Sequence, residues 1–394
     1  FFFLFIITVV NTESTIDFHR NNGDDDAHLD YDGYQLLRIK PINNKQIELI
    51  KQFQYDYQLD YWNQPVIQQN NDNNNNNFQS ILTLINPQQK QFIKSKLNQS
   101  NINYDIINPK MAEKISIGYS YERRNIFGIK IGNLMMNNNS SSSDQKIIFV
   151  ECGIHAREWI SPAFCIWLAG HLLSSSTTSQ LTSLIDHYQF IIIPSVNVDG
   201  YVFTHTHQRL WRKTRSRQYG SFCIGADPNR NWDSSWCQKG SSYDPCTDIY
   251  CGKRPFSEIE TRQMATFLQK YNGKIFAYFA IHSYSQLWMF PYGYSSKRIN
   301  DYNRLRSASQ AAVNAIRSLY GTQYKYGSIA DVIYLASGAS VDYVYDKLQV
   351  KNSFALELRD TGTYGFQLPI WQIIPTCLET WTGIKAAIKI LEIY

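Results

Sequence analysis

Three features that would indicate other classes of protein are missing from this 394-residue sequence. Long apolar runs are absent, and the apolar stretch at residues 1–10 is too short to cross a bilayer. The basic charge is weak, because the formal net charge is +5 and the densest basic run, Arg209 to Arg217, is interrupted by uncharged residues. CxxC pairs, which an all-cysteine zinc ribbon requires, are also absent. We therefore expect no membrane contact, no nucleic-acid partner and no zinc ribbon.

The first ten residues, FFFLFIITVV, have the length and composition of the apolar core of a secretory signal peptide. No initiator methionine and no basic leader precede them. We interpret residues 1–20 as a truncated signal peptide with its lead-in, and a buried N-terminal strand is the alternative. Six of the seven cysteines lie in closely spaced groups, which favours an oxidising compartment. The expected location is extracellular, or the lumen of the secretory or lysosomal pathway, with Cys377 left as a buried free thiol.

Residues 30–108 have the pattern of a small two-layer domain. Four stretches have strand patterns (34–39, 59–67, 80–85 and 102–107), and two have helical patterns (45–53 and 86–97). Asn86-Pro87 predicts an N-cap with proline at the first helical position. The order βαββαβ predicts a ferredoxin-like α+β domain, in which the asparagine run at 73–77 is an inserted low-complexity loop.

From residue 111 onward, strand patterns alternate with helical ones. Five apolar runs have the length of strands: 127–131, 146–152, 190–194, 275–281 and 353–358. Several are continuous rather than alternating, as in strands that are buried on both faces. Residues 111–394 are therefore predicted to form an α/β domain whose central sheet is mixed and largely parallel, with helices on both faces. Residues 137–143 are a second low-complexity insertion.

Two histidines and one glutamate follow buried strands. His155 and Glu158 come directly after the run 147–152, and Ser161-Pro162 then caps and opens a helix. His282 follows the apolar run 274–281. In an open α/β sheet the carboxyl ends of the strands form the ligand-binding crevice. A His-x-x-Glu pair alone is a weak signal, but with a second histidine it makes a three-ligand catalytic metal site that leaves one position for water.

Six further motifs occur in a fixed order along the chain. They are HAREWISPAF from residue 155, WRKTRS from 211, DPNRNWD from 227, IHSYSQLW from 281, ASGAS from 336 and ELRDTGTYGF from 357. In sequence and order they resemble the zinc metallocarboxypeptidases of the A/B type, and the resemblance covers almost everything after residue 30. It implies an exopeptidase that acts on peptide or protein C-termini, a monomer, and one zinc ion held by His155, Glu158 and His282.

The resemblance also implies which residues take part in catalysis. Glu357 corresponds to the base that accepts a proton from the attacking water. In the strand 353–358 the side chains of Phe354, Leu356 and Leu358 share one face, so Glu357 projects from the other. Arg212 corresponds to the residue that stabilises the negative charge on the carbonyl oxygen.

The remaining implied site residues bind the substrate. Arg230 corresponds to the guanidinium that binds the free C-terminal carboxylate with two parallel hydrogen bonds. Asn229 and Tyr334 contact the same group. Three further positions correspond to auxiliary contacts and an apolar wall of the site: Arg157, Tyr284 and Phe366.

Specificity depends on the residue at the base of the substrate pocket. Family members that remove Lys or Arg have an aspartate where this chain has Val341, and a cation buried against valine would lose its water without gaining a counter-charge. The neighbouring Asp342 is expected to point elsewhere, and Ala355 and Gly293 leave room for a large ring. We therefore predict A-type preference for aromatic or bulky aliphatic C-terminal residues. B-type preference for Lys or Arg is the alternative.

Three disulfides follow from the resemblance: Cys152–Cys165, Cys223–Cys246 and Cys237–Cys251. This three-bridge pattern resembles the basic-specific branch, whereas Val341 resembles the A branch. We give the pocket residue more weight, because specificity arises where the substrate side chain loses its water.

Residues 30–108 resemble the inhibitory propeptide of the family, which covers the active-site crevice until an activating endopeptidase removes it. Family members have several tens of residues between this domain and the segment that corresponds to residues 117–125, whereas here only residues 108–116 stand there. Lys110 and Lys114 are the tryptic-type sites near this short junction. We hypothesise that the zinc site survives while activation and stability are compromised. A catalytically inactive binding homologue is the third alternative.

Overall fold

The computed structural model describes residues 35–57, 59–61, 81–86, 88–107, 112–132, 145–174, 184–185 and 187–393. Near residue 112 the chain divides into two compact units, which we describe separately. The proposed signal peptide and both low-complexity insertions lie outside the described residues. No helix in the described part of the chain is both long and apolar enough to cross a membrane.

The first unit is a four-stranded sheet covered by two helices. Its elements are β1 (Gln35–Lys40), α2 (Asn44–Tyr57), β2 (Asp60–Tyr61), β3 (Ile81–Ile85), α3 (Lys90–Gln99) and β4 (Asn103–Ile107). The strand order is β2-β3-β1-β4, and the neighbours are antiparallel. Leu37 and Ile39 of β1 share one face and pack in one core with Ile50 of α2 and Ile93 of α3, so both helices lie on that face. The predicted ferredoxin-like domain is confirmed.

One helix of this unit begins later than its sequence signal predicts. The side chain of Asn86 accepts a hydrogen bond from the amide of Gln89 at 2.8 Å, but this interaction closes a turn. The helix α3 begins only at Lys90. The predicted N-cap therefore acts one turn ahead of the helix.

The second unit is built on one eight-stranded sheet. Its strands are β5 (Ala112–Tyr119), β6 (Asn125–Ile131), β7 (Lys146–Cys152), β8 (Tyr188–Ile193), β9 (Ile275–Ser283), β10 (Leu287–Phe290), β11 (Lys325–Ser328) and β12 (Ser353–Leu358). They are arranged in the order β11-β10-β12-β9-β7-β8-β6-β5. The central pairs β12–β9, β9–β7 and β7–β8 are parallel, and β10–β12 and β6–β8 are antiparallel. The mixed, largely parallel sheet is thus confirmed.

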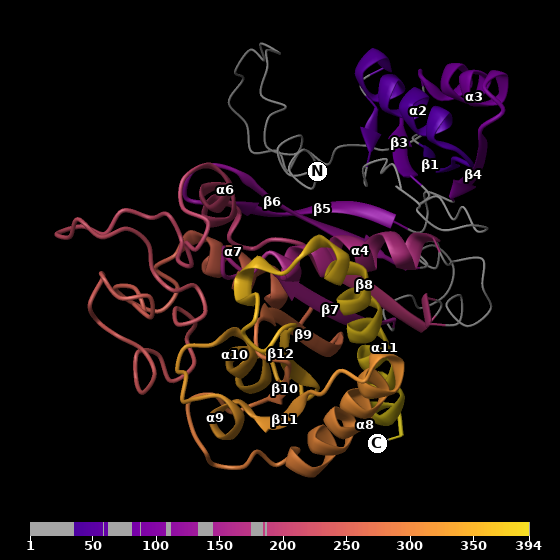
Figure 1. Ribbon diagram of the computed structural model, residues 1–394. Helices are drawn as coiled ribbons and strands as arrows, with labels where there is room; N and C mark the ends of the chain where they lie inside the picture. The colour runs from indigo at the N-terminus through magenta and orange to yellow at the C-terminus, as the bar shows by residue number, and fades with distance from the viewer. Residues whose placement is uncertain are drawn as a thin grey trace. The chain divides into compact units, whose positions relative to one another are not determined.

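Helices cover both faces of this sheet (Figure 1). The helices are α4 (Ile160–Ser174), α6 (Val198–Thr206), α7 (Ile259–Gln269), α8 (Tyr302–Tyr320), α9 (Ile329–Val332), α10 (Ser340–Asp346) and α11 (Ile373–Leu391), with 3-10 turns at Gly365–Gln367 and Ile370–Gln372. On one face, Gly383 of α11 packs so closely on Trp288 and Ile316 that an added Cβ would lie 2.9 Å from each. On the other face, Phe149 of β7 shares a core with Met264 of α7 and Val344 of α10. Burial on both faces explains why β7 has a continuous apolar sequence.

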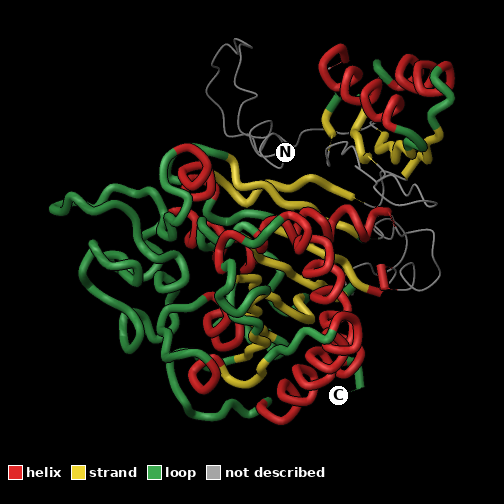
Figure 2. Tube along the Cα trace, viewed as in Figure 1, coloured by secondary structure: helices red, strands yellow, loops and turns green. Residues whose placement is uncertain are grey.

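A long irregular segment connects α6 to α7. Figure 2 shows residues 207–258 as loops and turns, without a regular helix or strand. Two disulfides, Cys223–Cys246 and Cys237–Cys251, lie within this segment. Because several predicted site residues are in the same segment, these crosslinks restrict how far the site can move.

Candidate active site

A candidate metal site, called here the metal-binding cluster and made of His155, Glu158 and His282, forms where β7 and β9 end. His155 and Glu158 lie in the loop between β7 and α4, and His282 is the penultimate residue of β9. The hydroxyl of Ser161 accepts a hydrogen bond from the amide of Gly153 and donates one to the carbonyl of Ile281. This serine therefore ties the loop that carries His155 to the strand that carries His282.

The three side chains converge on one point. His155 Nδ1 lies 2.7 Å from Glu158 Oε1, and His282 Nδ1 lies 3.1 Å from Glu158 Oε2. The two Nδ1 atoms are 3.2 Å apart. All three side chains are buried, and their ligand atoms lie within 4.8 Å of one another. Two imidazoles and one carboxylate are a donor set that zinc accepts.

Asp227, to which the sequence analysis assigned no role, joins this cluster to a buried arginine. Its Oδ1 lies 3.0 Å from His155 Nε2. Its Oδ2 accepts hydrogen bonds from Arg212 Nε at 3.1 Å and Nη2 at 2.7 Å. Burial opposes ionisation, but Arg212 and His155 outweigh it and hold the pKa of Asp227 well below its ordinary value. The available signal was the motif DPNRNWD, since a buried carboxylate needs charged or hydrogen-bonding partners.

The cluster is strongly coupled electrostatically. Burial opposes the charged imidazole of His282, but the Glu158 carboxylate outweighs it and raises the pKa of His282 to about 8. The two imidazoles hold the pKa of Glu158 below its ordinary value, against the effect of burial. Burial raises the pKa of Glu357 to about 8, and the nearby Glu158 carboxylate adds to the shift.

Glu357 lies beside His282, because these two residues are register partners in β12 and β9. Phe354, Leu356 and Leu358 are fully buried. Glu357 itself is only partly buried and lines the same pocket as His282 and Arg212. A carboxylate, a guanidinium and the metal-binding cluster therefore share one pocket.

Arg230 is held by backbone carbonyls at the edge of this pocket. Its Nε donates to the carbonyl of Gly240 at 2.7 Å, and its Nη1 donates to that of Asn229 at 2.9 Å. The side-chain oxygen of Asn229 accepts the amide of Ser340 at 2.9 Å. Tyr334 is half exposed, and its ring centroid lies 5.8 Å from the Arg230 guanidinium carbon. The guanidinium is thus buried and held in place, and the nearby Tyr334 ring is more exposed.

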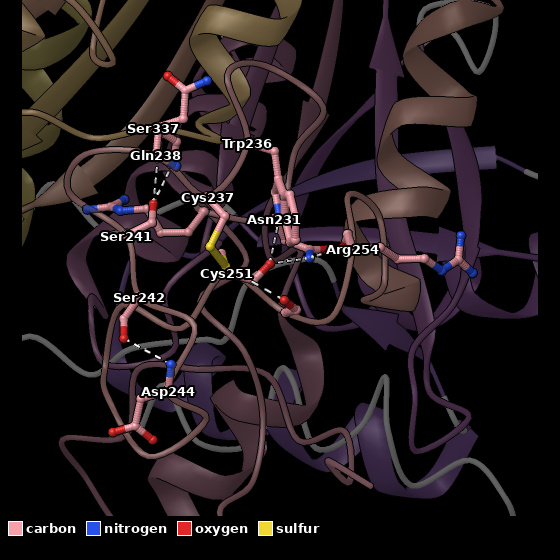
Figure 3. The surroundings of a disulfide bond; sticks show 12 residues. Asn231, Trp236, Cys237, Gln238, Ser241, Ser242, Asp244, Cys251, Arg254 and Ser337 are labelled. Atoms are coloured by element: carbon pink, nitrogen blue, oxygen red, sulfur yellow. Dashed lines mark hydrogen bonds between the residues drawn. A yellow bond between two sulfur atoms is a disulfide. The ribbon is translucent and has the colours of Figure 1, made fainter.

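The Cys237–Cys251 disulfide crosslinks the loop that carries Gln238 and Ser241 (Figure 3). Ser337, which precedes α10, accepts the amide of Gln238 at 2.9 Å, and its hydroxyl lies 2.8 Å from that of Ser241. The Gly240 carbonyl that binds Arg230 belongs to this same loop. The crosslink and these hydrogen bonds therefore fix the loop against the segment before α10.

The pocket has an apolar wall beside the polar groups of the metal-binding cluster, Arg212 and Arg230. Its wall includes Val341 and Ala355, together with Ala280, Met289, Ile329, Ile333, Ala336 and Ala339. Asp342 turns away from it, as expected, and accepts the amide hydrogens of Gly293 and Tyr294. An uncharged side chain suits such a wall better than a cation does.

The other predicted contact residues form a separate group. The Arg157 guanidinium lies over the Phe366 ring at 4.5 Å, and Nη1 of Arg157 lies 3.2 Å from Asp248 Oδ2. The rings of Tyr284 and Phe366 meet edge to face at 4.9 Å. These three residues are not among the described residues that line the pocket.

The three expected disulfides are present. Cys152–Cys165 links the end of β7 to α4, and the other two pairs brace the long loop. Cys377 is buried and free. The expected pairing is confirmed.

Two family profiles match the chain. The one described as "Zinc carboxypeptidase" matches residues 97–383, and the one described as "Carboxypeptidase activation peptide" matches residues 37–115. The two matched segments overlap at the short junction that the sequence analysis found.

Curated relatives and solved structures agree with these matches. Carboxypeptidase A2 of Mus musculus is 36% identical over 399 residues, covering 91% of this chain and 93% of the relative. Carboxypeptidase B of Homo sapiens is 44% identical over 279 residues, covering 71% of this chain and 65% of the relative. The structure of bovine thrombin-activatable fibrinolysis inhibitor, in complex with tick carboxypeptidase inhibitor, has a TM-score of 0.67 at 39% identity and covers 78% of this chain and 97% of its own. The chain belongs to the zinc carboxypeptidase family and is a metallocarboxypeptidase made as a zymogen.

Proposed function

We propose that this enzyme removes aromatic or bulky aliphatic residues from the C-terminal end of peptides and proteins, using one zinc ion. The observation that carries the proposal is the apolar pocket, with Val341 in its wall, which opens beside the metal-binding cluster and Arg230. A pocket of this kind accepts a large uncharged side chain and penalises a cation.

The residues present fit zinc. The two Nδ1 atoms and the Glu158 carboxylate converge on one point, and Asp227 orients His155 through Nε2. In our proposal His155, Glu158 and His282 hold the ion. When bound, the zinc supplies Lewis acidity toward the scissile carbonyl and the attacking water.

Glu357 and Arg212 are the proposed catalytic residues. The Glu357 carboxylate takes a proton from the attacking water and delivers it to the leaving amine. The Arg212 guanidinium stabilises the negative charge that develops on the carbonyl oxygen. Its bond to Asp227 keeps it oriented before the substrate arrives.

Recognition of the chain end is assigned to a group around Arg230. Its guanidinium binds the terminal carboxylate, Asn229 contacts the same group, and Tyr334 closes over it. Three residues outside the pocket take the role of contacts for upstream substrate residues: Arg157, Tyr284 and Phe366.

Specificity for C-terminal Lys or Arg is the second candidate. It is favoured by the three disulfides, which resemble the basic-specific branch, and by the 44% identity to carboxypeptidase B. Val341 argues against it, because the only carboxylate among the described residues that line the pocket is Glu357, the proposed base. The inactive binding alternative is not favoured, since the metal-binding cluster and the proposed base are all in place.

We further propose that the enzyme is secreted or retained in the lumen of the secretory or lysosomal pathway, acts as a monomer, and is activated by an endopeptidase.

Residues 30–108 are the proposed inhibitory domain and residues 111–394 are the proposed catalytic domain. The activating cleavage is proposed to fall between them. Lys110 lies outside the described residues. Lys114 lies in β5, with its ammonium 4.2 Å from the Phe127 ring centroid, so cleavage there requires an edge strand to detach. Incubation with trypsin tests the hypothesis that the short junction compromises activation, and a stable, active fragment that begins near residue 111 would rule that hypothesis out.

One experiment tests the proposed reaction. The enzyme should hydrolyse a blocked dipeptide ending in Phe at least about tenfold faster, in kcat/KM, than the same dipeptide ending in Arg. Glu357→Gln should keep about one zinc ion per chain and lose on the order of 10³-fold in kcat. A faster rate on the Arg peptide would overturn the A-type assignment, and near-normal kcat in Glu357→Gln would overturn the base.

A further inference from the structure

A row of side chains on one face of the sheet forms the floor of the substrate pocket. Met289 of β10 pairs in register with Ala355 of β12, Ala355 pairs with Ala280 of β9, and Ala280 pairs with Glu151 of β7. Register partners in a sheet point to the same face. Met289, Ala355 and Ala280 all line the pocket. Glu151 therefore continues this row, one strand beyond the residues that line the pocket.

Glu151 is a buried carboxyl with one free oxygen. Its side chain is 1% exposed. Its Oε2 accepts a hydrogen bond from the hydroxyl of Tyr278, a residue one step further along the same face of β9. Its Oε1 has no hydrogen-bond partner among the described residues. A buried polar atom of this kind costs stability unless something else binds it.

Ser340 stands between this carboxyl and the pocket. It lines the pocket, is 1% exposed, and has its amide held by the side chain of Asn229. Its hydroxyl acts as a hydrogen-bonding neighbour of both Glu151 and Tyr278 and lowers the pKa of each. Within the described part of the chain, however, the Ser340 hydroxyl makes no hydrogen bond of ordinary geometry. Two polar groups without an ordinary hydrogen bond therefore lie behind the apolar wall of the pocket.

We propose that Ser340, backed by Glu151, binds the phenolic hydroxyl of a C-terminal tyrosine. The phenol donates to Ser340 Oγ, and the Ser340 hydroxyl donates to the free Oε1 of Glu151. Ser340 contacts the substrate directly, and Glu151 is a positioning residue. This inference rests on the proposed A-type function and refines it, since it names the preferred aromatic residue.

A lysine or arginine fits these groups less well than a phenol. Burial raises the pKa of Glu151 to about 7, so this carboxyl carries less than a full charge at neutral pH. Among the described residues that line the pocket, Glu357 is the only one with a carboxylate, and it is the proposed base. A neutral hydroxyl needs only a hydrogen-bonding partner, which Ser340 supplies.

Substrates that differ only at the ring test the proposal. The activated enzyme is given blocked dipeptides ending in Phe, Tyr, 4-methylphenylalanine or Arg, with the same preceding residue. We expect kcat/KM for Tyr to exceed that for Phe about tenfold, and 4-methylphenylalanine to fall below Phe. Equal rates for Tyr and Phe, both above Arg, would overturn this inference and leave the proposed function intact. The highest rate on Arg would overturn both.

Variants show whether these two residues cause the preference. Ser340→Ala should bring the Tyr/Phe ratio of kcat/KM close to one. Glu151→Gln, which keeps an acceptor for Tyr278, should give an intermediate ratio. Ser309→Ala is the matched control, because Ser309 is also a buried serine but bonds to the Leu305 carbonyl within α8, and it should retain the wild-type ratio. If Glu151→Gln does not fold, Ser340→Ala decides, and an unchanged ratio in that variant overturns the inference.

Discussion

His155 Nε2 lies 3.0 Å from Asp227 Oδ1, although 72 residues separate the two in the sequence. The other oxygen of the same carboxylate holds Arg212. One buried aspartate thus orients a proposed metal ligand and a proposed oxyanion-stabilising group at the same time. Both groups face the pocket, so a change at Asp227 should affect metal binding and turnover by separate routes.

Asp227→Asn should weaken zinc binding about 10- to 100-fold, because an amide is a poorer acceptor for the imidazole N–H than a carboxylate. Competition with a chelator of known affinity measures this change. Asp233→Asn is the matched control, since Asp233 is exposed and belongs to the same motif. Equal zinc affinity in the two variants would show that the His155–Asp227 contact does not support the metal.

Much of the architecture was predictable from the sequence, because local hydrophobic patterns indicate which segments form strands and which form helices. Continuous apolar runs such as 146–152 predict strands buried on both faces, and β7 confirms this. Strand ends also predicted where His155 and His282 lie. The predicted start of α3 was wrong by a few residues, because the Asn86 side chain closes a turn ahead of the helix.

The supporting contacts of the site were not predictable in the same way. Asp227 lies in a segment without regular structure, so no periodicity indicates where its carboxylate points. The sequence around Glu151 indicates only a strand, and the register with Ala280 is what places this carboxyl next to the residues that line the pocket. Contacts of this kind depend on how distant segments pack.

Arg230 gives the clearest test of recognition of the chain end. Arg230→Ala should lower kcat/KM about 100-fold on a peptide with a free C-terminal carboxylate, mainly through KM, because that charge would lose its partner in a buried site. Arg230→Lys should recover only part of this loss, since an ammonium cannot make two parallel hydrogen bonds.

The control for this experiment is Arg217→Ala, which removes an exposed guanidinium from the same loop. It should leave KM unchanged. A peptide with an amidated C-terminus should be a poor substrate for the wild type and should respond little to Arg230→Ala. An equal loss on the free and amidated peptides would contradict the proposed role.

Glu260 predicts a pH dependence of stability. It is fully buried in the first turn of α7 and accepts the amide of Tyr121, and burial raises its pKa from 4.5 to about 8. Below pH 4.5 both the folded and unfolded states hold the proton, so the full stability is present. As the pH rises toward 8 the unfolded state releases the proton first, and the free energy of unfolding falls by on the order of 5 kcal/mol.

Glu260→Gln removes that titration and should flatten the pH profile of unfolding between pH 5 and pH 8, as measured with urea at a series of pH values. Glu113→Gln is the control, because Glu113 is 43% exposed in the same unit, and its profile should run parallel to that of the wild type. Parallel profiles for Glu260→Gln and the wild type would rule out a buried, protonated Glu260.

Val341→Asp should shift specificity toward basic residues. The new carboxylate would line the pocket and supply the counter-charge that a lysine or arginine needs when it is desolvated. Asp342 cannot act in this way, because the amides of Gly293 and Tyr294 already bind it. We expect the Arg/Phe ratio of kcat/KM to rise at least about 100-fold. Val341→Asn has nearly the same shape without the charge and should change the ratio much less. If both variants keep the wild-type preference, residue 341 does not set the specificity of this pocket.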